Sequence, residues 1–139
     1  MSGTVLVILD AGHAGLAPTA AELIGAASEV GTPAVLTDSR EHAEELGQVG
    51  ATQVLVAPLP SDAQTLPLVD AAEAAFNQLN PVAVVCAHTV RGRDVAARLA
   101  VRLRRALLTD ATGIRRDAEG IVTDHSNYGG AFSTVGAAT

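Results

Sequence analysis

The chain has 139 residues, of which 48% are hydrophobic, 17% are charged and 2% are aromatic, and its formal net charge is −6. A single cysteine excludes a disulfide scaffold, and the high apolar content excludes a disordered chain. The acidic balance and the near absence of aromatic residues argue against a nucleic-acid partner. Since there is no apolar run of the roughly 20 residues that a membrane helix needs and no export signal, we expect a cytoplasmic protein without membrane insertion.

Charge is distributed unevenly along the chain. Residues 1–90 contain ten acidic residues and one arginine, whereas residues 91–139 contain five acidic residues and eight arginines. A surface polarised in this way favours an oriented contact with a partner. A solvated helix face explains the same charges equally well.

Short aliphatic runs alternate with helical patterns through most of the sequence. Unbroken aliphatic runs indicate strands that are covered on both faces. They predict strands over residues 5–9, 34–37, 53–57 and 82–87. Apolar residues at helical spacing predict helices over 19–30, from 38 or 39 to 46, over 67–79 and over 91–107. Three short strands are expected after these, over 111–116, 120–124 and 131–135.

The helical patterns also predict which side chains are buried and where the first helix ends. Gly31 follows the first helix and suits a C-terminal cap, with Pro33 preventing continuation. In the last helix, arginines lie on the side opposite the apolar stripe and are expected to face solvent. The expected buried stripes are Ala20, Leu23, Ile24, Ala27 and Val30, then Leu68, Ala72, Ala75, Phe76 and Leu79, then Val95, Leu99, Leu103 and Leu107.

This alternation predicts an α/β fold with a doubly wound, mostly parallel sheet flanked by helices and followed by short C-terminal strands. Ligands in such sheets bind beyond the carboxyl ends of the strands, where the strand order reverses. If the order is 3-2-1-4-5, the segments 10–15 and 88–93 face each other across that crevice.

Few residues that could bind a ligand or a metal ion follow the predicted strand ends. Asp10, Gly12, His13 and Thr89 could serve a nucleotide, although no glycine-rich phosphate motif is present. Asp10, His13 and His88 could approach one another, but none of them has the spacing of a metal site. A hydrolase or metal enzyme is therefore the least supported reading.

Nucleophilic catalysis has no better candidate in the sequence. Cys86 lies within an aliphatic run, where a small buried thiol is the ordinary case, and no serine has the context of a nucleophile elbow. With no catalytic constellation and no metal residues assigned, we expect a binding or scaffold protein rather than an enzyme.

Three segments together give the chain a family resemblance. They are Gly50-Ala51-Thr52-Gln53-Val54-Leu55-Val56, the segment from Gly92 to Ala100, and the closing segment from Tyr128 to Val135. Over about residues 4–135 the chain resembles the N-terminal domain of the electron transfer flavoprotein alpha subunit. The resemblance implies the adenine-nucleotide alpha-hydrolase-like fold and a single domain over residues 1–139.

The resemblance also implies partners and a cofactor. The complete subunit would form a heterodimer with a beta subunit and carry electrons from flavin dehydrogenases through FAD to a membrane quinone oxidoreductase or similar acceptor. In that family FAD is held mainly by a C-terminal domain that residues 1–139 do not include. The chain would therefore be a scaffold and docking component of an electron carrier, with no FAD bound to it alone.

Two surfaces are candidates for contact with these partners. One is the helix face with Arg98, Arg102 and Arg105, and the other is the closing segment with Tyr128, Gly129 and Gly130. The alternative function is a stand-alone module that binds AMP or ATP at Asp10, Gly12, His13 and Thr89.

Overall fold

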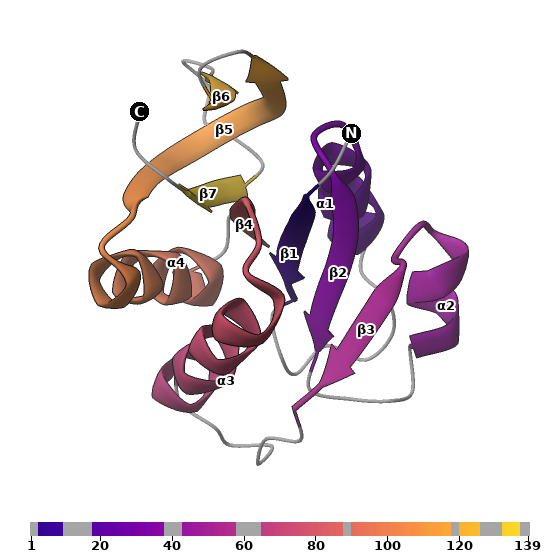
Figure 1. The fold of residues 1–139 in the computed structure, drawn as a ribbon, viewed down its shortest axis with the longest axis horizontal. Coiled ribbons are helices and arrows are strands. Elements are labelled where there is room, and N and C mark those ends of the chain that lie inside the picture. The colour runs from indigo at the N-terminus through magenta and orange to yellow at the C-terminus, as the bar shows by residue number, and fades with distance from the viewer. Residues whose placement is uncertain are drawn as a thin grey trace.

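A computed structural model describes residues 3–9, 18–37, 43–57, 65–87, 90–117, 120–125 and 132–136. The strands are β1 (Thr4–Ile8), β2 (Thr32–Thr37), β3 (Gln53–Val56), β4 (Ala83–Ala87), β5 (Ala106–Asp117), β6 (Gly120–His125) and β7 (Phe132–Gly136). The helices are α1 (Pro18–Ser28), α2 (Ala43–Gln48), α3 (Thr65–Leu79) and α4 (Val90–Leu103). The strands form one sheet of order β3-β2-β1-β4-β7-β5-β6 with helices on both faces (Figure 1), which confirms the predicted α/β fold.

The four strands β3, β2, β1 and β4 run parallel, and helices enclose their two faces in two apolar clusters. Alternate residues of β1 point to opposite faces, so Val5 and Val7 join the cluster under α1 and α2, whereas Leu6 and Ile8 join the one under α3 and α4. All four of these side chains are at most 3% exposed. Because β1 is buried on both faces, it needs the unbroken aliphatic run that the sequence shows.

The predicted helical stripes are confirmed for most of their residues, but Leu103 of the α4 stripe is only partly buried. The residues of the first stripe are all buried, and those of α3 are buried except Leu79, which is partly buried. Val69, which is 0% exposed, also joins the α3 stripe and was missed because a wide apolar face includes neighbouring positions. Leu107 does not belong to the α4 stripe, because it lies in β5.

The predicted strand order 3-2-1-4-5 is wrong beside β4. There β7 pairs antiparallel with β4, with Val135 opposite Val84, and β5 pairs antiparallel with β7 on the other side. Since β5 is antiparallel to an antiparallel neighbour, it still runs in the direction of β4 but lies one position further out. The crossover through α4 therefore skips the position next to β4, and β7 occupies that position between β4 and β5.

The predicted end of the last helix at residue 107 is also wrong, because α4 ends at Leu103. Arg104 takes a left-handed conformation with φ of 56°. Its N–H donates to the carbonyl of Val101 at 3.3 Å, and the N–H of Arg105 donates to that of Ala100 at 3.0 Å. This is a Schellman cap whose left-handed position usually holds glycine, so no residue type signalled the helix end.

The ends of α2 and α3 do use residues that favour a left-handed conformation. Asn80, with φ of 48°, follows α3 and precedes Pro81. Gly50, with φ of 122°, caps α2, where the N–H of Ala51 donates to the carbonyl of Leu46 at 3.0 Å. None of the helices in the described ranges is long and apolar enough to cross a bilayer.

Gly31 follows α1 as predicted, and its N–H donates to the carbonyl of Ala27 at 3.1 Å, but a second constraint explains why this residue is a glycine. Its φ is not positive, but a Cβ at this position would lie 2.5 Å from the carbonyl oxygen of Gly3. That oxygen accepts a hydrogen bond of 2.8 Å from the N–H of Thr32 where β1 and β2 begin to pair. Gly31 therefore permits a close approach of two backbone segments.

We predict that Gly31→Ala lowers the free energy of unfolding by about 1–3 kcal/mol, because the new methyl group must displace backbone. Gly25→Ala is the matched control, since a Cβ there meets nothing within 4 Å and alanine favours the interior of α1. That variant is expected to gain about 0.5–1 kcal/mol. Urea unfolding measures both changes, and equal effects of the two substitutions would contradict the close-approach explanation.

The cap of α4 predicts that Arg104→Gly raises the free energy of unfolding by up to about 1 kcal/mol, because glycine adopts the left-handed conformation without steric cost. Arg104→Ala removes the same exposed side chain but keeps the backbone cost, so it is expected to show no gain. Urea unfolding of both variants separates the two contributions, and an equal gain for alanine would rule out the backbone as the cause.

Candidate functional site

The carboxyl ends of β1 and β4 form the point where strand order reverses. The two strands are parallel neighbours, with Val7 beside Val85 and Ile8 beside Cys86. The connection from β1 leads through α1 to β2, whereas that from β3 leads through α3 to β4, on the other side of β1. The carboxyl ends of β1 and β4 therefore lie side by side, whereas the facing of the segments 10–15 and 88–93 stays a prediction, since most of their residues lie outside the described ranges. The candidate residues Asp10, Gly12, His13, His88 and Thr89 lie outside the described residues.

Three of the described side chains at this edge are buried. Ile8 is 3% exposed, Leu36 is 2% exposed and Cys86 is 0% exposed. A flavin dinucleotide needs a slot for its three-ring system and hydrogen-bond donors for its pyrophosphate. These three side chains provide neither, and the segments that follow the strands lie outside the described residues.

Cys86 is a buried thiol, as its place in an aliphatic run predicted. Burial raises its pKa from the ordinary 9.0 to about 12. Because the thiolate is the nucleophile, a thiol that stays protonated is inert. Among the described residues there is also no cluster of three histidine, cysteine or acidic side chains that could hold a metal ion.

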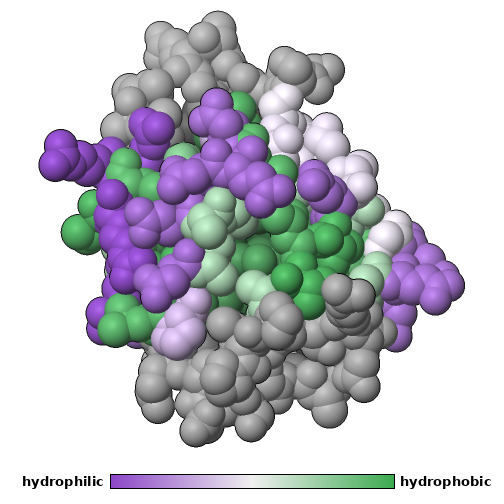
Figure 2. Space-filling model, turned by 60° about the horizontal axis from the view of Figure 1, so that its bottom comes forward, coloured by the Kyte–Doolittle hydropathy of each residue, from purple (hydrophilic) through white to green (hydrophobic). Residues whose placement is uncertain are grey.

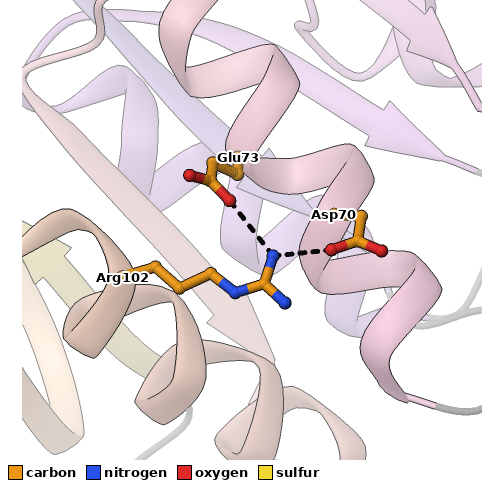
Figure 3. Close-up of polar contacts among 3 residues, drawn as sticks. All are labelled: Asp70, Glu73 and Arg102. Atoms are coloured by element: carbon orange, nitrogen blue, oxygen red, sulfur yellow. Dashed lines mark hydrogen bonds and ion pairs between the residues drawn. The ribbon is translucent and has the colours of Figure 1, made fainter.

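Arg102 joins the two helices that cover one face of the sheet. From α4 its Nη1 donates to Oδ1 of Asp70 at 2.6 Å and to Oε1 of Glu73 at 3.1 Å, and both acceptors lie on α3 (Figure 3). The hydrogen bond to Asp70 raises the pKa of Arg102 most, and the hydrogen bond to Glu73 raises it further. The side chain is 32% exposed. It therefore contacts solvent as predicted, but the neighbouring helix engages its charge.

The other two candidate arginines of this surface are exposed, as predicted, and also have intramolecular contacts. Nε of Arg98 donates to Oδ1 of Asp94 one turn earlier at 2.9 Å, and the Arg98 side chain is 51% exposed. The guanidinium of Arg105 lies 5.9 Å from the ring centre of Phe76 on α3, which is within cation–π range. The contacts of Arg102 and Arg105 thus fasten α4 to α3.

Val101 is a feature of this surface that the sequence reasoning missed. It is 79% exposed and lies three residues after Arg98, so the two share one side of α4, whereas Arg105 lies two residues beyond the end of this helix. The available signal in the sequence was an apolar residue that did not belong to the buried stripe of the helix. We define the α4 face as Arg98 and Val101, an apolar side chain beside a cation.

The second candidate surface is only partly described. Tyr128, Gly129 and Gly130 lie outside the described residues. The strand that follows them, β7, is paired on one side with β4 and on the other with β5. Since both of its edges are occupied, the backbone of β7 cannot accept a further strand.

Apolar surface also remains open near the carboxyl ends of the parallel strands. These ends point downward in Figure 1, and Figure 2, with this side brought forward, shows a hydrophobic area beside hydrophilic side chains. Partly buried apolar residues at the border of the cluster under α3 include Leu55 and Ala57, and Leu66 at the start of α3 is 48% exposed.

Comparison with known proteins connects this structure to one family. The profile of the electron transfer flavoprotein domain matches residues 5–139. The electron transfer flavoprotein subunit alpha of Mycobacterium leprae is 33% identical over 134 residues, which are 91% of this chain and 41% of that protein. The same subunit of Mycobacterium tuberculosis is 32% identical over 136 residues, which are 93% of this chain and 42% of that protein. The chain thus spans about two fifths of the length of these curated relatives.

The buried thiol predicts how stability depends on pH. In the unfolded chain Cys86 ionises above its ordinary pKa of 9.0, whereas in the folded chain it stays protonated up to about 12. The free energy of unfolding is therefore expected to fall as pH rises above 9, by at most about 1.4 kcal/mol per pH unit from this group. Urea unfolding between pH 7 and pH 10.5 measures this, with Cys86→Ala as the control that lacks the dependence. Identical slopes in both proteins would contradict it.

Proposed function

The chain belongs to the electron transfer flavoprotein family, and from this premise we propose that it is the scaffold and partner-docking domain of an electron transfer flavoprotein alpha subunit. The complete protein is a cytoplasmic heterodimer with a beta subunit, and it carries electrons from flavin dehydrogenases through FAD. This chain supplies no catalytic group to that process. The observation that carries the proposal is the family match across residues 5–139.

The buried ends of β1, β2 and β4 agree with a structural role for this part of the chain. Ile8, Leu36 and Cys86 are buried there and offer FAD no slot. We therefore assign FAD to the C-terminal domain of the complete alpha subunit. The residues of this chain would act by holding a rigid surface in place against the beta subunit and that domain.

The α4 face is suited to docking because contacts with α3 hold α4 in position. Arg102 binds two carboxylates of α3, and Arg105, just after the end of α4, lies over Phe76, so the C-terminal end of α4 is held against α3. A rigid surface loses less side-chain freedom on association than a mobile one. Val101 and Arg98 then match a partner surface that offers an apolar contact beside an acidic group.

Reversal of charge on the α4 face tests the docking role. We predict that Arg98→Glu combined with Val101→Asp weakens the affinity of the complete alpha subunit for its beta subunit at least about tenfold, measured by isothermal calorimetry, because it opposes the partner's charge and removes the apolar contact. Arg102 is left unchanged, since its substitution would also disturb the joint between α3 and α4. Glu44→Arg on exposed α2 is the matched control and is expected to keep the affinity. An affinity that is unchanged in the double variant would remove the α4 face from the proposal.

The alternative to the scaffold function is a stand-alone module that binds AMP or ATP. Features at the carboxyl ends of the parallel strands favour this alternative. Strand order reverses between β1 and β4, and partly exposed Leu55 and Ala57 offer apolar surface beside the carboxyl ends. Calorimetric titration of the chain with AMP or ATP distinguishes the two functions. One-to-one binding would favour the module, whereas the scaffold is expected to show no heat of binding and to purify without colour.

A further inference from the structure

The helices α3 and α4 contact each other, and many of their buried side chains are small. Both helices bury one side in the apolar cluster on the same face of the parallel strands. Four of the nine buried residues that they add to this cluster are alanines, namely Ala72, Ala75, Ala96 and Ala100. Packed helices hold a fixed relative position when the side-chain ridges of one fill the grooves of the other. Because alanine forms only low ridges, these side chains define the relative position of the two helices weakly.

Arg102 supplies a polar contact that defines this position more sharply. Its Nη1 donates to Asp70 at 2.6 Å and to Glu73 at 3.1 Å (Figure 3). The two acceptors are three residues apart on α3 and therefore lie on one side of that helix. A nitrogen that bonds both carboxylates must lie between them. A slide of α4 by one helical turn, roughly 5.4 Å, is not compatible with both bonds, and neither is a rotation that turns Arg102 away from α3.

The place of Arg102 in α4 links this contact to the α4 face. Arg98 lies one turn before Arg102, and Val101 is its direct neighbour in the chain. These two side chains are exposed, whereas Arg102 directs its charge toward α3. The guanidinium of Arg105 lies 5.9 Å from the ring centre of Phe76, close to the limit of about 6 Å for a cation–π contact, so it constrains α4 less. The orientation of the α4 face therefore depends mainly on Arg102.

We propose that Arg102 is a positioning residue, which sets the position of α4 on α3 and thereby the orientation of the α4 face toward a partner. The orientation toward a partner rests on the proposed docking function, whereas the position of α4 concerns this chain alone. In coiled coils a single polar residue can specify helix register without adding stability. Since the ion pairs of Arg102 are exposed, their contribution to stability is small, and the expected effect is on helix position.

Electron paramagnetic resonance of the 139-residue chain tests the position of α4. Spin labels on Ala74→Cys of α3 and Val101→Cys of α4 report the distance between the two helices, since both positions are exposed. Cys86 is buried and remains unlabelled. Arg102→Gln is expected to change a narrow distribution of distances into a broad one. Arg102→Lys keeps a cation near the carboxylates and is expected to restore part of the narrowness.

Arg98→Gln is the matched control for this measurement. It removes the same charge and one ion pair from the same helix, but its partner Asp94 lies on α4 itself, so the distribution is expected to stay narrow. The α3 double variant, Asp70→Ala with Glu73→Ala, removes both acceptors and is expected to broaden the distribution as Arg102→Gln does. Far-UV circular dichroism checks that each variant folds, and the α3 double variant remains decisive if Arg102→Gln does not fold.

The affinity of the complete alpha subunit for its beta subunit tests the consequence for docking. Arg102→Gln and the α3 double variant are each expected to weaken it at least about threefold in isothermal calorimetry. Their combination is expected to weaken it no further than either alone, because the same contact is already lost. Losses that add up would mean that Arg102 contacts the partner directly, which would overturn its role as a positioning residue.

Two results of the distance measurement would also overturn the proposal. They are a distribution that stays narrow in Arg102→Gln and an equal broadening in Arg98→Gln. Both concern helix position within the chain, so they would leave the docking function intact. Broadening in Arg102→Gln alone, with an affinity that neither this variant nor the α4 face variant changes, would support the positioning role and remove the α4 face from docking.

Discussion

Burial of β1 on both faces is the constraint on which the rest of the molecule depends. Its side chains alternate between two apolar clusters, and each of Val5, Leu6, Val7 and Ile8 is at most 3% exposed. A strand without a solvated face must have helices on both sides, and the parallel neighbours β2 and β4 require crossovers that supply them. The same constraint places the reversal of strand order beside β1, where ligands bind in folds of this kind.

The layer formed by α3 and α4 shows how charged side chains can serve the scaffold instead of a ligand. The two helices share an apolar cluster, and at their solvent side Arg102 connects them through two carboxylates. Exposed ion pairs are individually weak, so the apolar contacts hold the helices together and the arginine selects their relative position. The basic charge of this helix is therefore in part internal, whereas Arg98 and Val101 present a surface outward.

The parallel and antiparallel parts of the sheet differ in how completely they are covered. Within the described residues the parallel strands lie between two helical layers, whereas β6 has β5 as its only strand partner. Within the parallel part, the thiol of Cys86 is enclosed and stays protonated.

The sequence by itself determined the strands, the helices and their buried stripes, because these follow from the periodicity of neighbouring residues. It also determined the resemblance to the family, through segments such as Gly92 to Ala100. Only the tertiary structure decided that β7 enters between β4 and β5, and that Arg102 binds acidic residues about 30 positions earlier in the chain. It likewise decided that Gly31 is needed for the approach of Gly3, and that Arg104 ends a helix whose apolar pattern continues to Leu107. Each of these depends on which distant segments are brought together, and local periodicity carries no information about contacts of that range.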